Sequence, residues 1–408
     1  MNRDEIRKCL ISMVFIGLLL FPLVVGVTEK VSGKSISFFE LSGYTNSIEE
    51  PKFALTEYIK GDFQKEFEVW WGKDFEGRDI FIRIYNQLRY SLFDLNGSWA
   101  ATDSGIIGKN KTIFHEYYIE DALQYKEFYD FSLKKNQLAC QEYVQKLENI
   151  SELLENANKH LIFYITPSKG HFDKEQIPFR YVLKAKENLT ETIDAADYLA
   201  KELQKTELNW YDSREDLKQL QNTGIPVFYK TGIHCSKPAD YLISYKISNL
   251  MKDCLNGNFY TISLGNIIES SQPYWRDSDV YTLLNIFSGE KDNVYYSYDD
   301  VATYSSGPIE PFSVLIQGGS FAESFSKDFS ELSLGNNCYR IFYKQALYTN
   351  DNYTNYQVIQ EWTDLDLQQL IDDSKFILIE INDASIPQWS NGFIDYLEEF
   401  LETRYSYS

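Results

Sequence analysis

The strongest indication of chemistry in the sequence is centred on Ser320. The largely apolar residues 314–317 are typical of a short buried strand, and Gly318, Gly319 and Ser320 separate them from a run that can begin a helix. Such a sharp turn places a side chain at the carboxyl edge of a parallel sheet, where open α/β sheets bind ligands. The N-terminus of the next helix offers free N–H groups and a positive dipole end. Ser320 is therefore a candidate nucleophile whose own N–H can serve an oxyanion. The alternative is an ordinary loop with Ser320 as N-cap.

His234 is the candidate base. It is one of only 4 histidines, and it lies in the loop Y-K-T-G-I-H-C-S-K-P-A-D-Y, which we expect between an extended segment at 227–229 and a helix beginning at Pro238. A neighbouring imidazole activates a serine hydroxyl by accepting its proton. The order of the two residues carries no weight, because serine triads occur in every chain order. The alternative is an ordinary surface histidine. His115 is interpreted as a surface residue of a short strand or hairpin at 109–119.

Five motifs in chain order resemble a known family. They are D-F-E-G-R at 74–78, with Asp74, Phe75 and Arg78, followed by I-I-G-K-N-K-T-I-F-H-E, F-Y-I-T-P-S-K, Y-K-T-G-I-H-C and I-Q-G-G-S-F. Together they resemble the SGNH-hydrolase-like domains of the alginate O-acetyltransferase type, which include AlgJ/AlgX-like and DHHW-like proteins, over about residues 65–385. The resemblance implies Ser320 as nucleophile and His234 as base.

The acid of the triad does not carry over from this resemblance. Gly232 stands where the family has aspartate, and Cys235 stands where it has tryptophan. The acid fixes the imidazole tautomer and stabilises the imidazolium, and its loss costs about 10⁴-fold in turnover. Asp240, Asp277 and Asp279 are the candidate substitutes, and the sequence does not rank them. A Ser–His dyad and an inactive site are the alternatives.

Three further residues are candidate ligands. Asn382, at the end of an expected strand, is a candidate second oxyanion donor, and an ordinary turn residue is the alternative. Lys169 and Arg340 are candidate substrate-binding residues, with a solvated lysine and an ion-paired arginine as the alternatives. No Cys-X-X-Cys pair or histidine cluster suggests zinc, and we predict neither a metal nor a cofactor.

The predicted fold class is α/β, because helical patterns alternate with apolar strands. This alternation is typical of a parallel sheet covered on both faces, here SGNH-hydrolase-like by the resemblance. Residues 257–310 are interpreted as loop with short strands. Strands are expected at 160–166, 314–317, 339–343 and 376–381, and helices at 131–159, 189–206, 238–254, from 364, and at 390–404.

The N-terminal region predicts a membrane anchor. Residues 9–27 carry no charge and would span about 29 Å as a helix, close to the thickness of a bilayer core. Basic residues precede them, which predicts a cytoplasmic tail at 1–8 and an uncleaved signal anchor rather than a cleaved signal peptide. A stalk at 28–62 and an extracellular domain at 63–408 would follow. The predicted location is the cell membrane, single-pass, with the main domain outside the cytoplasm.

Charge and resemblance together narrow the function. A net charge of -21 argues against nucleic acid and anionic lipid as partners, and favours a neutral polysaccharide over a strongly anionic one. Four cysteines outside the anchor are no disulfide framework, although a Cys235–Cys254 bridge stays open. The resemblance implies a polysaccharide O-acetyltransferase that receives acetyl groups from a membrane-bound O-acyltransferase partner. A carbohydrate acetylesterase and a catalytically impaired glycan-binding or assembly protein are the alternatives.

Overall fold

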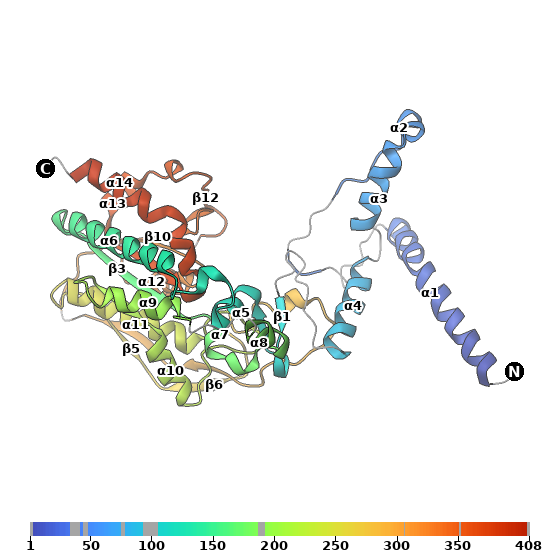
Figure 1. Cartoon of the computed structure of the whole chain (residues 1–408), viewed down its shortest axis with the longest axis horizontal. Helices are drawn as coiled ribbons and strands as arrows, with labels where there is room; N and C mark the ends of the chain where they lie inside the picture. The colour runs from blue at the N-terminus through green and yellow to red at the C-terminus, as the bar shows by residue number, and fades with distance from the viewer. Residues whose placement is uncertain are drawn as a thin grey trace. The chain divides into compact units, whose positions relative to one another are not determined.

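The chain forms two compact units in the computed structural model, one of residues 1–107 with 280–290 and one of residues 108–279 with 291–408 (Figure 1). The expected boundary at residues 62 and 63 does not coincide with this division. The motif residue Phe75 lies outside the described residues, as does the side chain of Asp74. The structure describes residues 3–32, 41–43, 48–74, 78–92, 105–186, 192–305, 307–350 and 352–405.

The first unit is mainly helical. Its helix α4 holds the 280–290 segment through polar contacts, because the Asn86 amide donates to the Leu284 carbonyl at 2.9 Å and the Tyr90 hydroxyl accepts from the Glu290 N–H at 2.9 Å. The elements of the unit are α1 (Arg3–Ser32), α2 (Leu55–Lys60), α3 (Asp62–Asp74), α4 (Arg78–Leu92), β1 (Gly105–Ile107) and the 3-10 helix η5 (Thr282–Leu284).

Helix α1 includes the apolar run at residues 9–27. Across the described part of the chain, however, no helix combines the length and the apolarity that a membrane crossing needs. The transmembrane signal anchor predicted from that run is therefore not supported.

A mixed seven-stranded sheet forms the centre of the second unit, in the order β12-β11-β10-β9-β13-β3-β4. The strands from β10 to β4 are parallel, and β11 and β12 extend the sheet as an antiparallel edge. The predicted parallel sheet is confirmed for the five strands from β10 to β4. The bounds are β3 (His160–Thr166), β4 (Trp210–Asp212), β9 (Ser313–Gly318), β10 (Cys338–Phe342), β11 (Ala346–Thr349), β12 (Gln357–Val358) and β13 (Ser374–Asn382).

Helices cover both faces of this sheet, which explains why its central strands are largely apolar. Leu161, Phe163 and Ile165 of β3 pack into one hydrophobic cluster with α6 (Lys134–Asn156), α9 (Ala195–Leu203) and α14 (Phe393–Tyr405). Helices α6 and α14 lie side by side (Figure 1). Because strand side chains alternate, Ile162 and Tyr164 face the opposite side, where α11 (Lys237–Cys254) contacts β3 and α12 (Ala322–Glu331) contacts β9 and β10.

The shorter elements connect and flank these layers. The stretch 257–310 forms the antiparallel pairs β5–β8 and β6–β7, as expected of loop with short strands. Residues 227–229 are not a strand, and the short edge strand β4 was not predicted. All five cysteines are free, so Cys235 and Cys254 are not bridged. The other α-helices and strands are β2 (Ile113–His115), α5 (Glu116–Leu123), α7 (Lys169–Phe172), α8 (Phe179–Lys186), α10 (Arg214–Asn222), β5 (Thr261–Leu264), β6 (Ile267–Ser270), β7 (Tyr295–Tyr298), β8 (Val301–Tyr304) and α13 (Leu367–Asp373).

Candidate active site

Ser320 lies in the turn between β9 and α12, as the sequence predicts. Strand β9 ends at Gly318, and α12 begins two residues after Ser320. The two glycines are needed because other groups occupy the space of a side chain. A Cβ at Gly318 would lie 2.6 Å from Glu380 Oε2, and a Cβ at Gly319 would lie 2.6 Å from the Tyr343 hydroxyl oxygen. The close approach of these two residues therefore shapes the turn that presents Ser320.

His234 contacts Ser320 directly. Its Nε2 lies 2.7 Å from Ser320 Oγ, although the two residues are 86 positions apart in the sequence. The imidazole is half-buried in the loop before α11, and its ring centroid lies 5.0 Å from that of Phe321. An imidazole in this position can take the proton of the serine hydroxyl. The structure thus brings the candidate nucleophile and the candidate base together at the carboxyl edge of the sheet.

Asp279 is the carboxylate that reaches His234. Its Oδ2 contacts His234 Nδ1, and its Oδ1 accepts a hydrogen bond from the Ile233 N–H at 3.1 Å. A carboxylate on Nδ1 favours the tautomer whose Nε2 can accept the serine proton, and it stabilises the imidazolium that results. Ser320, His234 and Asp279 therefore have the contacts of a Ser–His–Asp triad.

The other two candidate acids do not contact the imidazole. Asp240 is buried in the first turn of α11, and burial raises its pKa to about 7. Asp277 accepts a hydrogen bond from the Tyr274 N–H at 2.8 Å, and burial raises its pKa to about 7 as well. Both carboxyl groups therefore belong to the protein interior around the triad, and Asp279 alone of the three candidates is placed to orient His234.

Gly232 explains why the acid comes from a different segment. A Cβ at Gly232 would lie 2.7 Å from the Arg276 carbonyl oxygen and 2.8 Å from the Asp277 carbonyl oxygen. The segment that carries Asp279 therefore fills the space that an aspartate at position 232 would need. The carboxylate therefore comes from Asp279, which lies 45 positions after His234 in the sequence. Position 232, two residues before the histidine, has no side chain to supply one.

Lys169, a predicted substrate-binding residue, instead binds the loop that carries His234. The side chain is fully buried, and its Nζ donates to the carbonyl oxygens of Tyr229 at 2.6 Å, Lys230 at 3.1 Å and Gly232 at 2.6 Å. Burial lowers the pKa of Lys169 to about 8. All three carbonyls precede the histidine closely, so the ammonium group fixes the loop from the interior rather than contacting a glycan.

Asn382 and Arg340 are also turned away from the roles predicted for them. The Asn382 amide nitrogen donates to the Pro167 carbonyl at 2.9 Å, and its side-chain oxygen accepts from the Ala384 N–H at 3.2 Å. This is the turn role that the sequence left as the alternative. Arg340 is buried in β10, with its guanidinium carbon 4.5 Å from the centroid of the Tyr348 ring. Enclosure within the sheet leaves it unsuited to bind a substrate.

Glu380, which was not predicted as a site residue, holds the turn before Ser320 from the neighbouring strand. Its Oε2 accepts the Gly319 N–H at 2.7 Å, and its Oε1 accepts the Thr166 hydroxyl. Burial raises the pKa of Glu380 to about 7. Since the Gly319 N–H is bound by this carboxyl group, the backbone donor left for an oxyanion is the Ser320 N–H, which faces the Tyr343 hydroxyl.

Arg276 and Tyr343 approach Ser320 from two other segments. Arg276 Nη2 donates to the Ser320 carbonyl at 2.6 Å and to Glu323 Oε2 at 2.7 Å. The Tyr343 hydroxyl interacts with the backbone and the side chain of Ser320, and burial raises its pKa. Tyr343 is therefore within reach of an oxyanion formed at Ser320. Neither residue was predicted, because nothing in the sequence places residues 276 and 343 beside residue 320.

The segment that contains His234 is similar to a known protein family. Residues 127–242 match the family described as the SGNH hydrolase-like domain of the acetyltransferase AlgX. Over this segment the chain is AlgX-like. The resemblance predicted from the motifs is thus confirmed, and the AlgX-like segment includes His234 and Gly232. It ends before Asp279 and Ser320, whose placement is known from the geometry alone.

Several solved structures show some likeness to this chain. The O-acetyltransferase domain of AlgJ from Pseudomonas putida is 12% identical, with a TM-score of 0.42, over 73% of this chain and 99% of that one. PatB1 from Bacillus cereus is 12% identical, with a TM-score of 0.41, over 69% and 97%. A DHHW family protein from Eubacterium siraeum is 9% identical, with a TM-score of 0.37, over 62% and 88%. A search of curated protein sequences gives no match.

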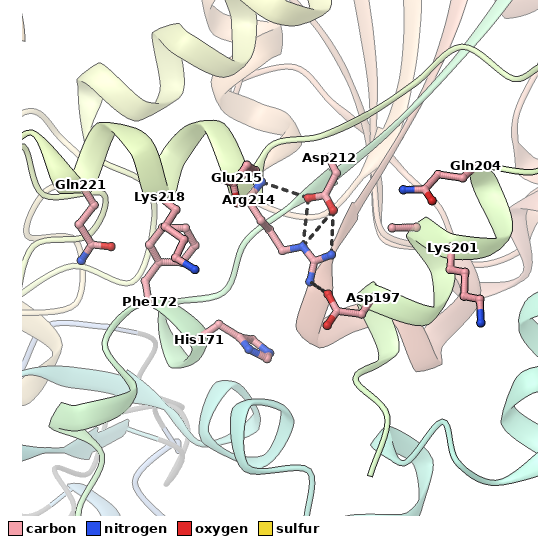
Figure 2. Close-up of a pocket in the computed structure, with 11 residues that line it drawn as sticks. His171, Phe172, Asp197, Lys201, Gln204, Asp212, Arg214, Glu215, Lys218 and Gln221 are labelled. Carbon is pink, nitrogen blue, oxygen red and sulfur yellow. Dashed lines mark hydrogen bonds and ion pairs between the residues drawn. The ribbon is translucent and has the colours of Figure 1, made fainter. Parts of the chain in front are cut away.

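A second group of charged residues lies near the end of β4 in the second unit. A cavity of about 690 Å³ is lined by residues that include His171, Asp197, Asp212 and Arg214, and no residue of the triad lines it. Figure 2 shows Arg214 bonded to both aspartates, with Nη1 3.0 Å from Asp197 Oδ1 and Nη2 2.7 Å from Asp212 Oδ2. The guanidinium is therefore occupied by protein carboxylates.

His171 links this cavity to a buried carboxylate cluster. Its Nε2 lies 2.8 Å from Asp121 Oδ2, and ligand atoms of Asp121, His171 and Asp383 all lie within 4.8 Å of one another. Burial alone would lower the pKa of His171. The negative charges of the facing Asp383 and Asp121 outweigh this effect, so that the pKa is raised to about 9. Among the described residues this cluster has donors of the type that bind metal ions, which the sequence analysis did not foresee.

Proposed function

We propose that the AlgX-like chain is a polysaccharide O-acetyltransferase that forms an acetyl-enzyme on Ser320. The observation that supports this is the continuous contact from Ser320 Oγ through His234 to Asp279, at the edge where α/β sheets bind their ligands. We propose acetyl as the transferred acyl group because residues 127–242 match an acetyltransferase family.

The first step is attack of Ser320 Oγ on the acetyl carbonyl of a donor. His234 Nε2 takes the hydroxyl proton, and Asp279 stabilises the imidazolium. The Ser320 N–H binds the oxyanion, and the Tyr343 hydroxyl is a second group within reach of it. Collapse of the tetrahedral intermediate breaks the bond to the donor's leaving group, which receives the proton from His234. The product of this half-reaction is the serine acetyl ester.

The second step repeats the sequence with a sugar hydroxyl as nucleophile. His234 deprotonates the hydroxyl as its oxygen attacks the ester carbonyl, and the imidazolium then returns the proton to Ser320 Oγ. The acetylated sugar leaves with its new ester bond, and the free enzyme is restored. Water in place of the sugar would make the same site an acetylesterase, which is the second candidate function.

The non-catalytic alternative rests on the absent aspartate at position 232. Asp279 provides a carboxylate at His234 Nδ1, so glycine at 232 is no reason to infer an inactive site. We also propose that a membrane-bound O-acyltransferase supplies the acetyl groups and that the catalytic unit lies outside the cytoplasm. Acetyl-CoA is cytoplasmic, so a transferase acting on a surface polysaccharide needs such a supply.

Full-length protein, incubated with a chromogenic acetyl ester and neutral oligosaccharides, tests the proposal. Wild type should release the chromophore and acetylate the sugar, detected as a mass increase of one acetyl group, and Ser320→Ala should do neither. Ser324→Ala, in the next helix turn, is the matched control and should stay active. Ester cleavage without sugar acetylation would favour the esterase, and the absence of Ser320-dependent turnover would refute catalysis at this site.

A further inference from the structure

Three potential metal ligands converge at the carboxyl edge of the sheet, outside the triad. Asp121 comes from α5, His171 from α7, and Asp383 from the residue directly after β13. Their ligand atoms all lie within 4.8 Å of one another, and His171 Nε2 is 2.8 Å from Asp121 Oδ2. Metal–ligand bonds to nitrogen and oxygen are about 2.0–2.2 Å long, so small side-chain movements would let all three atoms bind one ion.

The carboxyl group of Asp383 indicates that the cluster binds a ligand. Asp383 is 1% exposed, and within the described part of the chain neither of its oxygens has a hydrogen-bond partner. The nearby Ser168 N–H does not meet the geometry of a hydrogen bond to it. A buried carboxyl group without a partner costs several kcal/mol, unless an ion or a proton compensates for it. Two such oxygens facing a histidine and a second aspartate form a place where a cation can bind.

The surroundings of the cluster suit an ion that arrives from solvent. His171 keeps 22% of its side chain exposed and lines the 690 Å³ cavity shown in Figure 2, so water and ions can reach its ring. Two other charged groups lie close to the cluster. Asp194 Oδ2 lies 3.6 Å from His171 Nε2, and Arg214 is paired with carboxylates that include Asp194. The carboxylates therefore outnumber the cations around the ligand atoms.

We propose that Asp121, His171 and Asp383 bind one divalent transition-metal ion such as Mn²⁺ or Zn²⁺. Two carboxylates and one imidazole are a ligand set that such ions accept, and water from the cavity can fill the open positions. Binding would release to solvent the proton that His171 Nε2 shares with Asp121. The ion would join α5, α7 and the end of β13, which together cover the sheet edge beside the triad. This inference does not depend on the acetyltransferase proposal.

Titration of EDTA-treated, full-length protein with Mn²⁺ tests the site, with free Mn²⁺ measured by its electron paramagnetic resonance signal. Mn²⁺ is the better probe because thiolates prefer softer ions, and the chain has five free cysteines. Wild type should bind one tight equivalent that Zn²⁺ displaces. Asp383→Asn, which keeps the size of the side chain, should weaken that site at least tenfold, because even outer-sphere partners cost 10–100-fold.

Two further variants distinguish the site from adventitious binding. His171→Asn should lose the tight equivalent, whereas His234→Asn should retain it, since His234 faces Ser320. Circular dichroism melting without metal would establish that each variant is folded, and added Mn²⁺ should raise the melting temperature of wild type but not of Asp383→Asn. The absence of a stoichiometric site in wild type would overturn the proposal, as would equal binding by wild type and both cluster variants.

Discussion

Substitution of Gly232 tests whether the acid has moved to Asp279. By family resemblance, Gly232→Asp would restore a missing catalytic carboxylate. The structure predicts the opposite, because a Cβ at this position would lie 2.7 Å from the Arg276 carbonyl oxygen and 2.8 Å from that of Asp277. Both atoms belong to the backbone, so the segment leading to Asp279 has to move if any side chain is added.

The size of the effect follows from this contact. Ordinary van der Waals contact begins at 3.4 Å, so relieving the 2.7 Å contact needs a shift of about 0.7 Å. A misplacement of about 1 Å at a catalytic group can cost about 10²-fold in rate, and overpacking typically costs about 1–3 kcal/mol of stability. We therefore expect Gly232→Ala to lose about 10- to 100-fold in turnover and to melt at a lower temperature. Gly232→Asp should lose at least as much, since its carboxylate would also lie near that of Asp279.

The assay is Ser320-dependent cleavage of the chromogenic acetyl ester, with melting followed by circular dichroism. Gly307→Ala is the matched control, because a Cβ there meets no atom within 4 Å, and its activity and melting should match those of wild type. A Gly232→Asp variant as active as wild type, or more active, would refute both the assignment of Asp279 and the steric argument.

Three further predictions concern residues around the triad. Asp279→Asn should lower turnover about 10⁴-fold with little change in stability, whereas Asp277→Asn should stay within tenfold of wild type. Lys169→Met should destabilise the protein by at least about 3 kcal/mol in denaturant unfolding, because three buried carbonyls lose their charged donor; equal stability to the exposed control Lys205→Met would contradict this. The pKa of Glu380 is raised to about 7 in the folded protein, so the folded state favours the protonated carboxyl group. The stabilisation of the fold by this group is therefore complete below its unfolded pKa near 4.5 and is lost as the pH rises to about 7. Glu380→Gln should therefore reduce the loss of stability between pH 4.5 and 7 by about 3 kcal/mol, and an unchanged slope would contradict the role of this carboxyl group.

The sheet was predictable where strands are buried on both faces. Strand β3 has the predicted bounds, and β13 extends the predicted 376–381 by two residues at its start and one at its end. Such strands need largely apolar runs, which are visible in a sequence. Strand β4, Trp210–Asp212, was missed because three residues ending in an aspartate have no distinctive periodicity. Its position depends on pairing with β3, which is a property of the folded chain.

The candidate site was predictable only in part, for a similar reason. Ser320 and His234 were identified because their surroundings resemble known motifs, and the fold brings them together. Asp279 could be proposed but not ranked, because the distance from a carboxylate to an imidazole depends on the path of a loop. Lys169 was misjudged because its partners are backbone carbonyls, whose presence no pattern of side chains records.

The attachment of the histidine loop to Lys169 also matters for engineering. Because an interior ammonium group sets the shape of this loop, its geometry does not depend on the solvent-facing residues nearby. Trp275 is 44% exposed and stacks 4.4 Å from the guanidinium carbon of Arg276, which in turn binds the Ser320 carbonyl. Under the proposed transfer reaction, random libraries can therefore vary position 275, which is exposed beside Arg276, while position 169 should be held constant in every clone.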